Sequence, residues 1–409
     1  MLTLIISALI SICIVLVFRF LNKPYKPPLF GVYQQNNKYY WFKYVFIFIV
    51  LTLKQWYWRL LRAHAVDIGR SCDGTIHVHK DDAFLEQKHD LGDSPQANDS
   101  TLFLGITTDG ADAVEIGIAQ RQGNYCEALL CGVEYLSLNL PDTFVEQDES
   151  DKGELFSVQG IKIEHFIPMR TWKLSYCGKM KSNSNPEKTV NVQAELTWSA
   201  LFAPFIYGDQ MSPRCLASDL AREPWFSDYF RNIEKFGQVH YDQMGSMRGV
   251  VLVDDQKHVV TMPCFRNRKR HEWRVFHRFV FHSVYLDNGD CIVITCMSQP
   301  LICSHMTMGY VCRKSDQAVL AVQSSDLKLY QHGENQITPK NYGFSFKAGG
   351  KRYAVHVTVD NEGEYYMGQR DVKIYDHQLT VDVNGVRGRG FGQWMYNNVV
   401  NEQSSNNTN

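Results

Sequence analysis

The sequence lacks the short motifs that mark the commonest catalytic and metal centres. It contains no GxSxG nucleophile motif, no HExxH metal-binding motif, and no GxGxxG nucleotide loop. It also lacks an excess of either charge, because 42 Lys and Arg stand against 43 Asp and Glu. A nucleic-acid partner requires a basic surface, so the composition predicts no binding of nucleic acid.

Cysteines and histidines are numerous but poorly spaced for metal binding. The eleven cysteines include no CxxC pair, and reduced thiols are favoured over a disulfide framework in a chain too long to need one. His277 and His282 are separated by an odd number of residues, so on one strand they would point to opposite faces. We therefore expect neither a metal nor another cofactor.

The stretch Gln238–Gln299 carries the strongest structural signal, that of a β-rich protein. It begins with an alternation that puts His240, Asp242 and Met244 on one face and Tyr241 and Gln243 on the other. A dense polar segment from Arg266 to Glu272 follows, just before an aromatic strand over Val275–Tyr285. Tyr and Phe, 21 and 23 in number, suit large β-sheet cores or an apolar pocket.

Four segments of this sequence together carry a family resemblance: His240–Gly249, Arg266–Trp273, Leu286–Gly289 and Gly388–Asn398. They resemble the hydroxyneurosporene synthase/AttH-like superfamily, and most of all its animal branch related to phosphoenolpyruvate-synthase-like proteins. The resemblance covers roughly residues 156–398. It implies an all-β protein of two tandem lipocalin-like β-barrels that handles lipophilic small molecules.

Domain limits follow from composition and from this resemblance. We predict a transmembrane anchor over 1–21, a juxtamembrane segment with a second, amphipathic helix over 22–66, and a linker over 67–100. A first barrel over 101–201 and a second over 237–400 are joined by a linker over 202–236. The Ser- and Asn-rich tail 401–409 is expected to be disordered.

The N-terminal prediction rests on an uninterrupted apolar run, Leu2–Phe18. A retained single-pass anchor fits this run better than a cleaved signal peptide, and basic residues after it predict a cytoplasmic globular part. The next apolar segment, Trp41–Leu61, is expected to form a helix that lies on a membrane or packs on the protein's own core. A second spanning helix is a further alternative.

A ligand site is expected inside the second barrel. In the aromatic strand, the odd-numbered residues make the better barrel lining, which selects His277, Phe279 and Phe281. The full set of expected ligand-binding residues is Tyr241, Gln243, Arg266, Asn267, Trp273, His277, Phe279, Phe281, Gln393 and Trp394.

The polar segment limits how far an enzymatic function can be predicted. Relatives typically have Arg-Asp-His at this point, whereas this chain has Arg266, Asn267 and Arg268. An amide does not exchange protons near neutral pH and an arginine stays charged, so this pair offers no acid and no base. The first expectation is therefore a membrane-anchored binding or transfer protein for a lipid or isoprenoid-like molecule. The alternatives are a hydratase, isomerase or cyclase acting on such a molecule, and an interaction protein with closed barrels.

Overall fold

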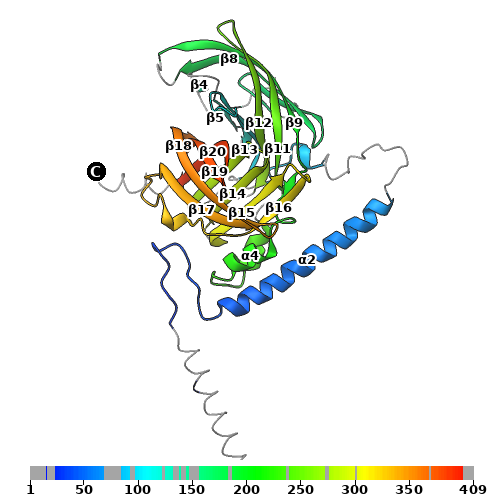
Figure 1. Ribbon diagram of the computed structural model, residues 1–409, viewed down its shortest axis with the longest axis vertical. Coiled ribbons are helices and arrows are strands. Elements are labelled where there is room, and N and C mark those ends of the chain that lie inside the picture. Colours follow the sequence, from blue (N-terminus) through cyan, green and yellow to red (C-terminus); the bar gives the residue numbers. More distant parts are fainter. Residues whose placement is uncertain are drawn as a thin grey trace, which may run out of the picture.

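The structure is a computed structural model, and it is built mostly of β-strands. It describes residue 15 and residues 24–68, 84–92, 97–121, 125–131, 138–139, 144–146, 156–182, 187–235, 239–271, 276–299, 302–367 and 370–398. Within these residues a large curved sheet lies over a closed barrel, and helices flank the barrel on the side away from the sheet (Figure 1).

The curved sheet runs in the order β5-β3-β2-β1-β12-β11-β9-β8-β7-β6, with every pair antiparallel. Its strands are β1 (Asn98–Ile106), β2 (Ala113–Arg121), β3 (Tyr125–Cys131), β4 (Leu138–Asn139), β5 (Phe144–Glu146), β6 (Phe156–Val158), β7 (Ile161–Ile167), β8 (Thr171–Ser182), β9 (Thr189–Ala200), β10 (Phe205–Ile206), β11 (Val239–Val253) and β12 (Gln256–His271). In the described chain its end strands do not pair with each other, so this body is a curved sheet where the sequence predicted a barrel.

The second body is a closed barrel, as predicted, in which β13 pairs with both β14 and β20. Its strands are β13 (Arg278–Leu286), β14 (Cys291–Gln299), β15 (Cys303–Arg313), β16 (Ala318–Ser325), β17 (Asn341–Ala348), β18 (Lys351–Met367), β19 (Val372–Val383) and β20 (Val386–Asn397). A short 3-10 helix, η3 (Leu329–Gln331), lies between β16 and β17.

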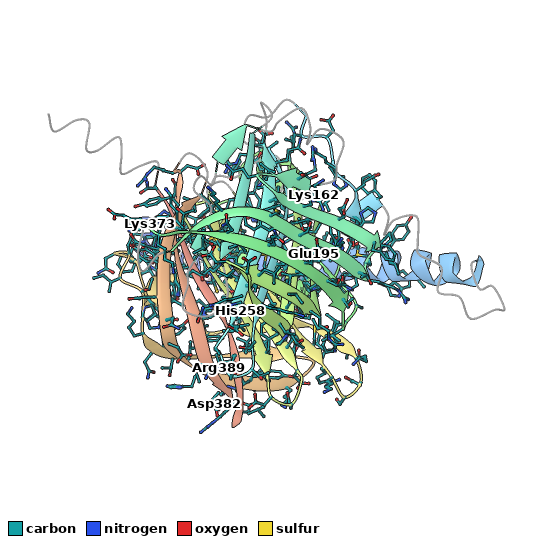
Figure 2. The ribbon with its side chains drawn as sticks, turned by 90° about the horizontal axis from the view of Figure 1, so that it is seen from above. Lys162, Glu195, His258, Lys373, Asp382 and Arg389 are labelled. Carbon is teal, nitrogen blue, oxygen red and sulfur yellow. The ribbon has the colours of Figure 1, made fainter. Side chains whose placement is uncertain are left out.

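Strict alternation of apolar and polar residues shapes the outer layer of the curved sheet. In β9, residues 190, 192, 194, 196 and 198 are buried and those between them are exposed. Figure 2 labels Lys162 of β7 and Glu195 of β9, which belong to the exposed set of this layer. Because side chains of a strand point alternately to its two faces, one face of this layer is buried and the other is exposed to solvent.

The described residues form three large hydrophobic cores and one small cluster around Tyr241. One fills the concave side of the curved sheet, around Trp172 and Trp198. A second fills the barrel, around Trp394 and Tyr342. The third joins the two bodies, with Phe265 and Phe281 in ring contact at 5.1 Å between centroids. Because the third core is continuous, the sheet and the barrel are held as one packed unit.

The boundary between the two bodies differs from the predicted one. The sequence placed residues 237–271 in the second barrel, but β11 and β12 form a long hairpin that pairs with β9 and β1. The division therefore falls between β12 and β13 instead of near residue 237. Sequence proximity to β13 suggested otherwise, and only the inter-strand hydrogen bonds decide the sheet to which a hairpin belongs.

The helix predicted over Trp41–Leu61 is present as the longer α2 (Tyr40–Ile68). One face packs on the protein: Ile47 is buried, Lys43 Nζ donates to the carbonyl of Glu223 at 2.7 Å, and Gln55 Nε2 donates to the carbonyl of Met211 at 2.6 Å. These contacts involve the region of α4 (Pro213–Leu220) and α5 (Tyr229–Lys235), within the segment predicted as a linker. The predicted contact with a bilayer stays a prediction.

The membrane localisation requires correction. None of the helices that the structure describes combines the length with the apolar character needed to cross a bilayer. This finding overturns the single-pass assignment made from sequence. The apolar run Leu2–Phe18, on which that assignment depended, lies outside the described residues apart from position 15.

Candidate functional site

A cavity of about 210 Å³ lies between the curved sheet and the barrel. A dry cavity of roughly 150 Å³ already accepts a benzene-sized molecule, so this space suits a small organic ligand. Its polar lining includes Asn98, Ser100, Thr101, Glu115, Tyr207, His240, Asp242, Asn267, Lys269, His271, Thr295, Gln299, Tyr365, Tyr366 and Gln393. Its apolar lining includes Leu102, Ile118, Ala119, Phe265, Phe276, Phe279, Phe281, Met297, Met308, Met367, Val372 and Met395.

Strand alternation explains why polar groups face this space from the sheet side. In β11 the even positions, His240 and Asp242, point toward the barrel, and in β12 the odd positions do. The register pairs Asp242 with Asn267 and His240 with Lys269. Side chains opposite each other on one face of an antiparallel pair lie about 5 Å apart, so these groups meet as a cluster.

Asp242 is the centre of this cluster. It is 1 % exposed, Tyr207 donates its hydroxyl to Oδ2 at 2.6 Å, and Asn267 Nδ2 donates to Oδ1 at 2.6 Å. Burial raises the pKa of the Asp242 carboxyl to about 7, against the lowering effect of these hydrogen bonds and of nearby Lys269. At neutral pH this carboxyl therefore populates both its acidic and its basic form.

Basic groups surround this carboxyl. The His240 ring stacks on Tyr207, with centroids 3.9 Å apart, and its Nε2 lies 3.9 Å from Asp242 Oδ1. Burial, then the neighbouring Lys269 charge, holds the pKa of His240 and of His271 well below the usual value, so both imidazoles are neutral. Burial lowers the pKa of Lys269 to about 8. Four groups able to exchange protons, namely Asp242, His240, Lys269 and His271, thus line one end of the cavity.

A second polar group faces the cavity from β2. Glu115 is buried, and its Oε1 accepts hydrogen bonds from Gln393 Nε2 and from the Tyr365 hydroxyl, both at 3.2 Å. Gln393 and Tyr365 belong to β20 and β18 of the barrel, so Glu115 joins the two bodies. Burial, reinforced by the Asp376 carboxylate, raises the pKa of Glu115 well above its usual value.

The expected site residues do not all lie in the cavity. Four of them, Asn267, Phe279, Phe281 and Gln393, line the cavity. The other placed residues do not: Tyr241, Gln243 and Arg266 lie on the opposite face of the curved sheet, Trp394 lies in the barrel core, and His277 lies against Tyr33, with the two ring centroids 6.1 Å apart. Trp273 lies outside the described residues.

Arg266 occupies a wholly buried position in the sheet. Its guanidinium pairs with Glu86 and lies 4.3 Å from the ring centroid of Trp172. It also donates to the Tyr241 hydroxyl. These contacts tie the segment 84–92 to the concave face of the sheet, away from the cavity.

The choice of faces in β13 also needs correction. The odd-numbered residues, predicted to line the barrel, point out of it toward the curved sheet, as Phe279 and Phe281 do. The even-numbered residues fill the barrel, where His282 Nε2 lies 2.6 Å from the Tyr342 hydroxyl. Both faces of this strand are buried, because the barrel packs under the sheet, and a strand covered on both sides gives no alternation signal.

Several cavity residues were absent from the sequence prediction, namely Asp242, His240, Lys269, His271, Tyr207 and Glu115. The sequence did put His240 and Asp242 on one face, and that alternation was the available signal. What it could not show is that this face meets the barrel. Nor did it offer Asp242 as an acid of the site.

Comparisons with known proteins agree with this architecture. The chain belongs to the family of unknown function DUF8627, whose match spans residues 4–396. No curated protein matches the sequence. Among solved structures, the chain is similar to an AttH protein from Nitrosomonas europaea, with a TM-score of 0.50 and 9% identity over 79% of this chain and 97% of that one.

Two further solved structures match with lower TM-scores. CghA with Sch210972 gives a TM-score of 0.46 at 9% identity, over 76% of this chain and 94% of that one. Kievitone hydratase from Nectria haematococca gives a TM-score of 0.44 at 13% identity, over 74% of this chain and 90% of that one. The likeness to the AttH protein supports a lipocalin-like fold. The predicted relations to hydroxyneurosporene synthase and to phosphoenolpyruvate-synthase-like proteins stay predictions.

The donor set of the site does not suit a metal ion. In the part of the chain that the structure describes, no three His, Cys, Asp or Glu side chains converge to hold one. The seven cysteines with described side chains are free, and six of them are buried. The arrangement can hold an apolar molecule and exchange protons with it.

Proposed function

We propose that this protein is an acid–base enzyme that moves a proton on a largely apolar small molecule, in a hydratase, isomerase or cyclase type of reaction. The observation that carries this proposal is the position of Asp242. Its carboxyl, with a pKa of about 7, faces a cavity walled by Phe279, Phe281 and several methionines. A carboxyl that titrates near the working pH is suited to act as both acid and base.

Asp242 is the proton carrier in this proposal. As a carboxylate it takes a proton from one carbon of the bound molecule, and as a carboxylic acid it returns a proton to another carbon. Tyr207 and Asn267 are positioning residues, because each holds one carboxyl oxygen through a 2.6 Å hydrogen bond. Isomerisation or cyclisation by such transfers consumes no co-reactant, and hydration consumes one water.

A binding or transfer protein for a lipophilic molecule is the second candidate. The aromatic and methionine side chains of the cavity favour retention of an apolar ligand on their own. The enzymatic proposal is preferred because pure retention gives no reason to bury Asp242 among Tyr207, His240 and Lys269. Burial of a carboxyl group costs free energy, and a site built only for apolar binding would avoid it.

Incubation in D₂O with a lipid extract separates the two candidates, because the label itself reveals which compound has reacted. The purified protein is incubated with the extract, and mass spectrometry detects compounds that gain deuterium at carbon. We expect wild type to label a compound and Asp242→Asn to label none. Asp255→Asn is the matched control, since Asp255 lies exposed in the β11–β12 turn. A compound that is retained but never labelled would favour the binding protein instead.

A further inference from the structure

The cavity has a second polar end, formed by Glu115. The register places Glu115 in a row with Leu104 and Phe265, whereas Asp242 shares a row with Asn267 and Leu102. Strands β2 and β11 are three strand spacings apart, and the two rows differ by two residues along the strand. With ~4.8 Å per spacing and ~3.4 Å per residue, the Cα atoms of Glu115 and Asp242 are ~16 Å apart along the sheet.

The surroundings of Glu115 favour its neutral form. No cation forms an ion pair with this carboxyl in the described part of the chain, whereas Asp376, a second acid, lies near it. Its two described hydrogen bonds both reach Oε1, from Gln393 and Tyr365. A buried carboxyl without a cation, beside another carboxyl, keeps a proton. Since Oε1 is occupied by two donors, the proton belongs on Oε2.

We propose that Glu115 donates a hydrogen bond from Oε2 to a carbonyl or hydroxyl oxygen of the substrate, which is therefore an elongated, uncharged molecule with an oxygen at the end away from Asp242. This inference rests on the proposed function and specifies its substrate class. The length of the substrate follows from the register. The two Cα atoms are ~16 Å apart along the sheet, and a ~3 Å hydrogen bond at each end leaves on the order of 10 Å for the substrate.

The arrangement also gives the two acids separate tasks. Glu115 binds the oxygen and polarises the attached carbon skeleton by a hydrogen bond, without losing its proton. Asp242 moves the proton at the far end. Two carboxyls with different surroundings can perform different tasks in one cavity, because burial and neighbouring charge set each protonation state separately.

Two aromatic probes that differ by one oxygen function test the role of Glu115. Binding of 2-acetylnaphthalene and of naphthalene is measured by fluorescence titration with wild type, Glu115→Gln and Glu115→Leu. We expect wild type to prefer the ketone about fivefold, the effect of one hydrogen bond of ~1 kcal/mol. Glu115→Gln, which keeps an N–H donor, should keep this preference, and Glu115→Leu should lose it while still binding naphthalene.

The pH dependence supplies a second readout. In wild type the ketone preference should disappear as the pH rises through the raised pKa of Glu115, because the ionised carboxyl has no proton to donate. In Glu115→Gln the preference should not change with pH. Thermal unfolding of each variant confirms that the binding data come from folded protein.

Other outcomes would overturn the inference. An unchanged ketone preference in Glu115→Leu would show that the carboxyl only holds the barrel to the sheet. Failure of both probes to bind wild type would also contradict it. The proposed function is tested separately. A protein that keeps the ketone preference but labels no compound with deuterium would contain the Glu115 hydrogen-bond donor without transferring a proton at carbon.

Discussion

Asn267 Nδ2 donates a 2.6 Å hydrogen bond to Asp242 Oδ1, across the β11–β12 pair. The amide therefore orients a carboxyl on the neighbouring strand. The acid of this surface stands on β11, one strand away from Asn267. The hydrogen bond also leaves the second oxygen to Tyr207, so both sides of the carboxyl are fixed.

Ionisation of Asp242 should destabilise the fold. Its pKa rises from 3.8 in the unfolded chain to about 7 in the folded protein, so the folded state holds its proton more tightly. The stability that comes from this proton is fully present below pH 4 and is lost as the pH rises toward 7. At ~1.4 kcal/mol per pKa unit, the loss amounts to about 4 kcal/mol.

Chemical denaturation of wild type and Asp242→Asn across this pH range measures the effect. The difference in free energy of unfolding between the two proteins should shift in favour of the variant as the pH rises from 4 to 7. Asp255→Asn should show no such trend. A difference that stays constant with pH would mean that Asp242 titrates with an ordinary pKa.

Arg266→Ala should lower the free energy of unfolding by about 3–5 kcal/mol, because it leaves the buried Glu86 carboxylate without a cation. The double variant Arg266→Met with Glu86→Leu should recover most of this loss, since a well-packed apolar pair can replace a buried ion pair. Binding of 2-acetylnaphthalene by the folded double variant should match wild type. Weakened binding without loss of stability would instead assign Arg266 to the ligand, as the sequence suggested.

His282 should stay neutral down to strongly acidic pH. Burial lowers its pKa to about 3, and the Tyr342 hydroxyl lies 2.6 Å from its Nε2. An unfolded histidine titrates near 6.5, so this group's contribution to stability is present above pH 6.5 and declines as the pH falls toward 3. NMR titration of the imidazole C–H signals measures the value. Titration of His282 near pH 6 would show that water reaches the barrel interior.

Ala119→Leu should close part of the cavity. Ala119 is buried on β2 and faces this space, so a larger side chain has room to enter it at little cost in stability. We expect binding of naphthalene to weaken at least about tenfold, equivalent to ~1.4 kcal/mol. Ala354→Leu, at an exposed position of β18, is the control. Unchanged binding in Ala119→Leu would place the ligand elsewhere.

The sequence alone determined much of the secondary structure and the fold class. The aromatic segment Val275–Tyr285 predicted the strand β13, and the apolar segment Trp41–Leu61 predicted the helix α2. It also put His240 and Asp242 on one face of a strand. These are local properties, because the period of a side-chain pattern depends only on backbone geometry.

Tertiary structure alone decided where these faces meet. The β11–β12 hairpin joins the curved sheet through its register with β9 and β1, and no local pattern specifies that choice. Packing of the barrel beneath the sheet buries both faces of β13, which removed the signal that distinguishes Phe279 from His282. The cavity and the pKa of Asp242 arise from that packing, because burial between two bodies is a property of neither strand by itself.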